Sequence, residues 1–142
     1  MRTLILACLL ASPACAEDAR ITIQLTFDSP ALTDLQKRGE GVVISAYYAG
    51  MPNVTSTMPL DEMGQIYLGA ETITILPENR TVDIGAGLGG SALGMTDAPM
   101  VNVNVYSARF TDQDNLLNCG IVDGPVADYI GTTQIIRCSL IR

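Results

Sequence analysis

A glycine-rich stretch is the first part of this sequence whose residue types and spacing could support chemistry. Residues Gly85 to Gly90 match the G-x-G-x-x-G pattern, in which backbone amides approach a pyrophosphate at the start of a helix. The residues that follow, 91–98, contain Gly94 and run into Pro99, so the long helix that a dinucleotide site requires is missing. We therefore interpret the stretch as a flexible loop and predict no nucleotide cofactor.

An acidic segment is a second candidate, for calcium. Residues 111–115 read Thr-Asp-Gln-Asp-Asn, which places carboxylates two positions apart, as a calcium-binding loop does. Leu116 then occupies a ligand position, and neither the glycine nor the distal glutamate of such a loop follows. We interpret the segment as a solvated hairpin turn between Phe110 and Leu116. A weak cation site to which Asp123 and Asp128 contribute is kept as an alternative.

Thioether groups offer a third kind of ligand set, for Cu(I). The chain has no histidine to accompany them, their spacing is irregular, and methionine also fills gaps under long loops. We predict no metal site, and a carrier of a small molecule or of a metal ion (Cu or Ca) is the alternative function. The methionines concerned are Met51, Met58, Met63, Met95 and Met100.

The composition gives catalysis little support. No histidine is available as a general base or zinc ligand. The adjacent Asp61 and Glu62 diverge in direction, and no other acidic pair has a spacing that brings two carboxylates onto one face of a helix. We predict a non-enzymatic protein, with a hydrolase that uses two carboxylates across a cleft as a second alternative.

The first sixteen residues have the features of a secretory signal peptide. One arginine precedes a short apolar run, Ala14 and Ala16 suit signal peptidase, and acidic residues follow at once. We predict cleavage after Ala16 and a periplasmic or secreted protein. A lipoprotein signal ending at Cys15 is the competing interpretation, but the large aliphatic residue expected three positions earlier is absent.

Removal of residues 1–16 leaves two cysteines, Cys119 and Cys138, in a compartment that favours oxidation. Only one pairing is then available, so we predict a disulfide between them. Both cysteines alternate with polar residues in apolar rows, Cys119 between Leu117 and Ile121, so each thiol should face a core. The pair lacks the C-x-x-C spacing of a redox catalyst, and its role should be structural.

The charge balance limits the kinds of partner. The chain carries 15 acidic and 8 basic side chains, a formal net charge of −7, and the cut after Ala16 would remove one of the arginines. An acidic chain without a basic cluster is repelled by phosphate backbones and anionic lipid surfaces, so we predict no nucleic-acid binding. No segment after the signal reaches the length of a membrane span.

Short stretches of alternating apolar and polar residues recur along residues 17–142, which we predict to form one domain. Residues 20–27 and 101–106 alternate most regularly, 41–49 are nearly apolar throughout, and 50–64 read as an irregular connection. One helix is expected from Ser29 at the N-cap to Gly39. Seven or eight short strands with one short helix predict an all-β fold, an antiparallel β-sandwich.

The polar side of the strand 101–106 is the remaining candidate for function. Val101, Val103 and Val105 alternate with Asn102, Asn104 and Tyr106 there, so amides and a phenol form an outward row. Tyr47 is expected on the solvent side of another strand. Such a face can recognise a sugar, a peptide or a protein, although antiparallel sheets also carry ordinary polar faces. Pairing of an edge strand with a partner is an equal alternative. We predict a protein-binding or accessory module.

Overall fold

The computed structural model describes residues 19–142, so the predicted signal peptide and its cleavage site lie outside the described residues. No helix in this part of the chain is long and apolar enough to cross a membrane. The elements are, in chain order, β1 (Ile21–Phe27), α1 (Ser29–Arg38), β2 (Val42–Pro52), β3 (Ile66–Ile75), β4 (Arg80–Ile84), α2 (Gly90–Leu93), β5 (Thr96–Ser107), β6 (Leu117–Cys119), β7 (Val122–Pro125), the 3-10 turn η1 (Val126–Asp128) and β8 (Thr133–Leu140).

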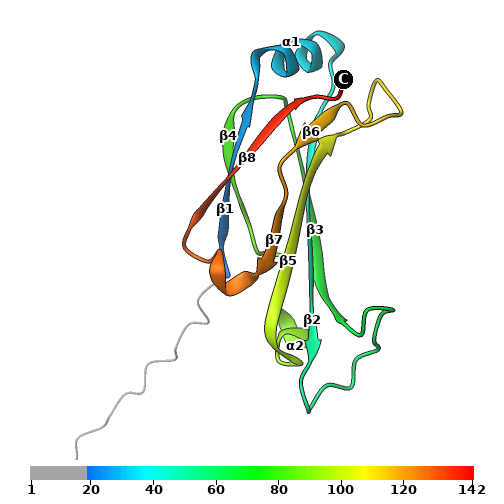
Figure 1. The fold of residues 1–142 in the computed structure, drawn as a ribbon, viewed down its shortest axis with the longest axis vertical. Coiled ribbons are helices and arrows are strands. Elements are labelled where there is room, and N and C mark those ends of the chain that lie inside the picture. Colours follow the sequence, from blue (N-terminus) through cyan, green and yellow to red (C-terminus); the bar gives the residue numbers. More distant parts are fainter. Residues whose placement is uncertain (1–18) are drawn as a thin grey trace, which may run out of the picture.

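The strands form two four-stranded sheets that enclose one core (Figure 1). Sheet A has the strand order β4-β1-β8-β6, and sheet B has the order β3-β2-β5-β7. This confirms the predicted all-β sandwich. One pair, β1 with β8, is parallel, while the other five pairs are antiparallel. Nearly the whole chain separates β1 from β8, so no tight turn dictates the direction in which they pair.

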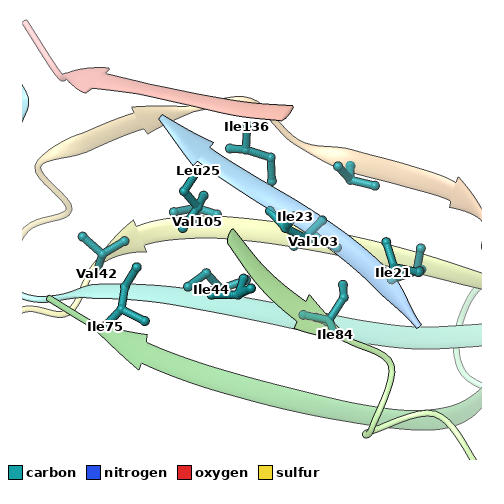
Figure 2. Close-up of a cluster of buried hydrophobic side chains, with 14 of the residues drawn as sticks. Ile21, Ile23, Leu25, Val42, Ile44, Ile75, Ile84, Val103, Val105 and Ile136 are labelled. Atoms are coloured by element: carbon teal, nitrogen blue, oxygen red, sulfur yellow. The ribbon is translucent and has the colours of Figure 1, made fainter. Parts of the chain in front are cut away.

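The core consists of the inward residues of the alternating strands (Figure 2). The rows predicted from residues 20–27 and 101–106 both point inward, and Val103 and Ile23 are fully buried. Burial of one such side chain contributes about 1.5–3 kcal/mol, so the inward rows of all the strands together supply the hydrophobic driving force for folding. The labelled side chains in Figure 2 are Ile21, Ile23, Leu25, Val42, Ile44, Ile75, Ile84, Val103, Val105 and Ile136.

Helix α1 covers one end of the sandwich (Figure 1) and begins one residue earlier than predicted. Asp28, not Ser29, is the N-cap, because its side chain accepts a hydrogen bond from the Ala31 amide at 2.9 Å. Gly39 ends the helix in the left-handed conformation, with φ of 70°. Ser29 therefore occupies the first turn rather than the cap.

The end of the chain differs from the sequence prediction in two ways. Strand β6 stops at Cys119, so Ile121 does not continue its inward row and is 63% exposed. Strand β7 follows shortly after and is not indicated by the sequence, because Gly124 and Pro125 within it are turn-forming residues. β7 pairs with β5 at the edge of sheet B, where a proline is tolerated.

The two cysteines lie opposite each other in the β6–β8 ladder, as the single available pairing predicted. Their sulfur atoms are 2.07 Å apart, at disulfide distance. Cys138 is buried in the core, and Cys119 is partly buried against it. The pair joins a three-residue edge strand to the strand that β1 also contacts, so it anchors β6 in sheet A.

Candidate functional site

The predicted row of amides and a phenol lies on the outer side of sheet B. Strand β5 pairs with β2 so that Asn102 is opposite Tyr47, Asn104 is opposite Ser45, and Tyr106 is opposite Val43. Because side chains alternate across a strand, these residues face away from the core that receives Val101, Val103 and Val105. With two further aromatic residues described below, we call this surface the aromatic–amide face, and it comprises Tyr47, Tyr67, Asn102, Asn104, Tyr106 and Phe110.

Hydrogen bonds fix the amides of this face. Asn104 Nδ2 donates to Asn102 Oδ1, and Asn102 Nδ2 donates to Asp123 Oδ1 at 3.0 Å. Asp123 is the residue opposite Asn102 on β7, so the network crosses two strands. A side chain already held in one orientation loses less conformational entropy when a ligand binds, which favours recognition by this row.

A bulge in β3 adds Tyr67 to the face. The register of β2 and β3 passes from Tyr48 opposite Gly69 to Ala49 opposite Tyr67, which leaves Leu68 without a partner. The extra residue turns Tyr67 outward, and its ring centroid lies 5.5 Å from that of Tyr47. Tyr67 is 52% exposed and Tyr47 is 44% exposed, so the two rings present a large aromatic area to solvent. Tyr67 alternates with Ile66 and Leu68 in the sequence, but its place beside Tyr47 depends on the bulge.

Phe110 extends the face at the start of β2. A Cβ on Gly41 would lie 2.6 Å from Phe110 Cε2, so the ring rests on the glycine, whose alternation with Val42 places it on the outer side. The ring is nevertheless 64% exposed. Four of the seven aromatic residues in the chain, which has five Tyr, two Phe and no Trp, therefore lie on one face. The regular alternation ends before Phe110, so the sequence does not indicate this position.

A buried carboxylate holds the loop that carries Phe110. Glu40 is 1% exposed, and it accepts hydrogen bonds from the backbone amides of Gly41, Phe110 and Thr111 and from the Thr111 hydroxyl, each at 2.9 Å. Burial alone would raise the pKa of Glu40, but these four donors together outweigh it and lower the pKa from 4.5 to about 2. The neighbouring Arg109 has φ of 61°, a strained conformation for a residue with a side chain.

The glycine-rich stretch is docked onto a partly buried carboxylate, that of Glu71, rather than flexible. Glu71 Oε1 accepts from the amides of Gly85 at 2.6 Å and Gly87 at 3.2 Å, and from Tyr48 Oη at 2.6 Å. Burial, together with the charge and hydrogen bond of Glu71, raises the pKa of Tyr48 well above its usual range, so the phenol stays a donor. The amides that a dinucleotide would need are thus already used, and α2 is one short turn.

The acidic segment 111–115 is a crossover rather than a hairpin turn. It connects β5 in sheet B with β6 in sheet A, because β5 ends at Ser107 and β6 begins at Leu117. Asp112 Oδ2 lies 3.6 Å from Arg38 Nη1, and Asp123 Oδ1 accepts a hydrogen bond from Asn102 Nδ2. Within residues 19–142, no three His, Cys, Asp or Glu side chains are close enough together to hold a metal ion.

The methionines of the predicted copper set occupy unlike environments. Met51 is 59% exposed near the end of β2, and Met63 is 79% exposed in the irregular connection between β2 and β3. Met58 and Met95 instead pack against the core. Met100 is half-buried on β5. Their thioethers therefore do not share one environment, and the two that fill gaps near the core have the structural role that methionine often takes.

Hollows in the surface contain few groups that could act in catalysis. One of about 960 Å³ lies between the start of α1 and the ends of β6 and β8, and Asp28 is the acidic side chain in its wall. Another, of about 300 Å³, contains Glu40 and Glu78. Glu40 is bound by four donors and stays ionised near neutral pH, so it cannot serve as a general acid there. This pair gives the carboxylate-hydrolase alternative no support.

The chain matches no protein-family model, and comparisons with curated proteins and with solved structures found no match either. The most distinctive feature of the molecular surface is the aromatic–amide face.

Proposed function

We propose that this chain is an exported, non-enzymatic module that binds a protein partner through its aromatic–amide face. The observation that carries the proposal is the exposed pair Tyr47 and Tyr67 beside the hydrogen-bonded amides of Asn102 and Asn104. Tyrosine supplies contact area with few rotatable bonds and is enriched at the centres of protein interfaces. The fixed amides add hydrogen bonds that select the partner.

The charge of the molecule supports a protein partner over a nucleic acid. The net charge of −7 repels phosphate backbones, whereas the face itself presents phenols, a phenyl ring and amides. Asp123 is the acidic residue in the hydrogen-bond network of the face, and it accepts a hydrogen bond from Asn102. A neutral or basic protein surface fits this arrangement, since it would meet no repulsion from the acidic chain.

Export is part of the proposal and has its own test. Intact mass spectrometry of the protein recovered from the host should give a chain that begins at Glu17, with two hydrogens gained on reduction of the disulfide. A chain that keeps residues 1–16, or that carries lipid on Cys15, would contradict the proposed export and cleavage.

The binding proposal is tested by recovering tagged protein from its own host and measuring bound proteins by native mass spectrometry. The wild type should carry a stoichiometric protein partner, and Tyr47→Ala should lose it because the centre of the face is removed. Gln24→Ala is the matched control, since Gln24 is exposed on the outer side of sheet A. Equal loss from both variants, or a bare monomer that carries a metal or small ligand, would overturn the proposal.

A further inference from the structure

Strand β3 presents unpaired backbone groups at the edge of sheet B. In the described part of the chain, β2 is the one strand that pairs with it. In an antiparallel ladder, the N–H and C=O groups of every second residue turn away from the partner strand. A Cβ on Gly87 would lie 2.7 Å from the Ala70 carbonyl oxygen, so that carbonyl faces the glycine-rich loop and not β2. By the same alternation, Thr72 and Thr74 turn their backbone groups outward.

Residues 72–76 of this edge lack the features that usually prevent an edge strand from pairing with another strand. Residues 72–76 read Thr-Ile-Thr-Ile-Leu, with no charge, no proline and high strand propensity. Natural edge strands commonly carry a lysine, a proline or a covering loop, and here the covering loop reaches Ala70. Thr72 and Thr74 are exposed, and Leu76 just beyond the strand is 74% exposed. An additional strand therefore fits at residues 72–76.

We propose that this strand is β3 of a second copy of the chain, paired antiparallel about a twofold axis near Thr74. Charge argues for a second copy here. The chain has 15 acidic and 8 basic side chains, so most contacts between two copies would bring carboxylates together. Residues 72–77 contain no acidic side chain, so pairing this segment with itself brings no carboxylates together. The segment is also self-complementary, as a twofold interface requires. Thr74 would face Thr74 of the second copy, and Thr72 would face its Leu76, which buries the exposed leucine.

Pairing of this kind joins the two B sheets into one sheet of eight strands. The outer faces of both copies then lie on the same side, so the two aromatic–amide faces stay open and next to each other. A partner with two matching surfaces would bind such a dimer more tightly than a monomer. The interface is short, so the dimer should dissociate on dilution.

Sedimentation velocity from about 1 to 500 µM tests the dimer. The wild type should shift from monomer to dimer as concentration rises, and Thr74→Lys should remain monomeric because it places two lysines opposite each other. Thr81→Lys is the matched control, since Thr81 is exposed on β4 at the edge of sheet A. It should dimerise like the wild type. Amide exchange at Thr72 and Thr74 should slow with concentration in the wild type.

Thr74→Pro separates lost pairing from lost folding. Its N–H points away from β2, so the proline removes an outward donor while the β2–β3 ladder remains. This variant should keep the far-UV circular dichroism of the wild type and stay monomeric. A wild type that is monomeric throughout, a Thr74→Lys variant that dimerises, or a Thr81→Lys variant that does not would each overturn the proposal. A monomer that takes up a strand from another protein would also do so.

Discussion

At the scale of single residues, Glu71 explains the glycine-rich stretch. One oxygen of its carboxylate accepts hydrogen bonds from two backbone amides of the loop and from the hydroxyl of Tyr48. These hydrogen bonds hold the loop against β3. Close approach of the loop requires residues without side chains. A Cβ on Gly85, which has φ of 126°, would lie 1.9 Å from the Ala19 carbonyl oxygen. The motif that resembles a phosphate-binding loop is therefore a packing device in this molecule.

The substitution Gly85→Ala should lower the free energy of unfolding by about 2 kcal/mol or more, because the new methyl group meets backbone and the conformation is strained. Gly89→Ala is the matched control. Gly89 lies in the same stretch with extended backbone, and a Cβ there has no atom within 4 Å. Urea denaturation should show a reduced midpoint for the first variant and a near-normal one for the second. Equal midpoints would show that the loop is not packed as described.

Some of this arrangement was accessible from the sequence. Glu71 alternates with Ile73 and Ile75, so the two-residue period places its carboxylate on the inward side of the strand. An inward-facing carboxylate requires hydrogen-bond donors, and a nearby run of glycine amides is one source of them. The choice of Gly85 and Gly87 as those donors depends on tertiary contacts, which local periodicity does not determine.

At the scale of elements, Glu40 links two parts of the chain that are far apart in sequence. It follows α1 directly and binds the amides of Phe110 and Thr111 in the crossover between the sheets. Arg38, in the last turn of α1, lies 3.6 Å from Asp112 of the same crossover. The exposed ion pair contributes little, so the buried carboxylate supplies most of the attachment.

Because the ionised carboxylate of Glu40 holds the crossover, we expect the protein to lose stability in acid. The folded-state pKa of Glu40 is about 2 and the unfolded value is 4.5, so the unfolded chain binds the proton more readily. The stabilisation is complete above pH 4.5 and is lost as the pH falls toward 2. Near neutral pH, Glu40→Gln should be about 2 kcal/mol less stable than the wild type, and the gap should narrow in acid. The control, Glu62→Gln, changes an exposed side chain.

Urea denaturation across the range from pH 7 to pH 2 measures both variants. Parallel curves for the wild type and Glu40→Gln would contradict the assignment, since the carboxylate would then contribute nothing that depends on its charge. A decrease for Glu62→Gln as large as that for Glu40→Gln would contradict it as well.

The disulfide also stabilises an element, because β6 has three residues and pairs with one strand of sheet A, β8. Cys119 and Cys138 are 19 positions apart, and closing a loop of this length contributes about 3 kcal/mol. Reduction should lower the urea midpoint of the wild type. The double variant Cys119→Ser/Cys138→Ser should have the lower midpoint already and be insensitive to reductant. A wild-type midpoint that reduction leaves unchanged would contradict this role.

The sequence predicted the elements unequally well, for physical reasons. Regular alternation located β1 and β5, and the cap residues located α1 to within one position. Strand β7 contains Gly124 and Pro125, whose local preference is for turns, so only pairing with β5 makes it a strand. The segment 111–115 has the polarity of a hairpin turn. Its actual path from one sheet to the other depends on which strands pair, and composition does not encode that.

At the scale of the whole molecule, the two sheets have different outer surfaces. Strand β1 of sheet A presents Thr22, Gln24 and Thr26 outward, as an ordinary polar face does. Sheet B instead gathers aromatic rings around fixed amides on its outer side. The sequence located Asn102, Asn104 and Tyr106, but Tyr67 and Phe110 joined them through a bulge and a crossover. The function proposed for the chain rests on this difference between the sheets.

Site-specific photocrosslinking in the native host tests that claim most directly. A benzophenone amino acid replaces Tyr47 on the aromatic–amide face in one strain and Gln24 on sheet A in another. We predict one discrete crosslinked protein adduct from position 47 and none from position 24, because the partner covers sheet B. Adducts of equal yield at both positions, or adducts at position 24 alone, would contradict the assignment of the binding face.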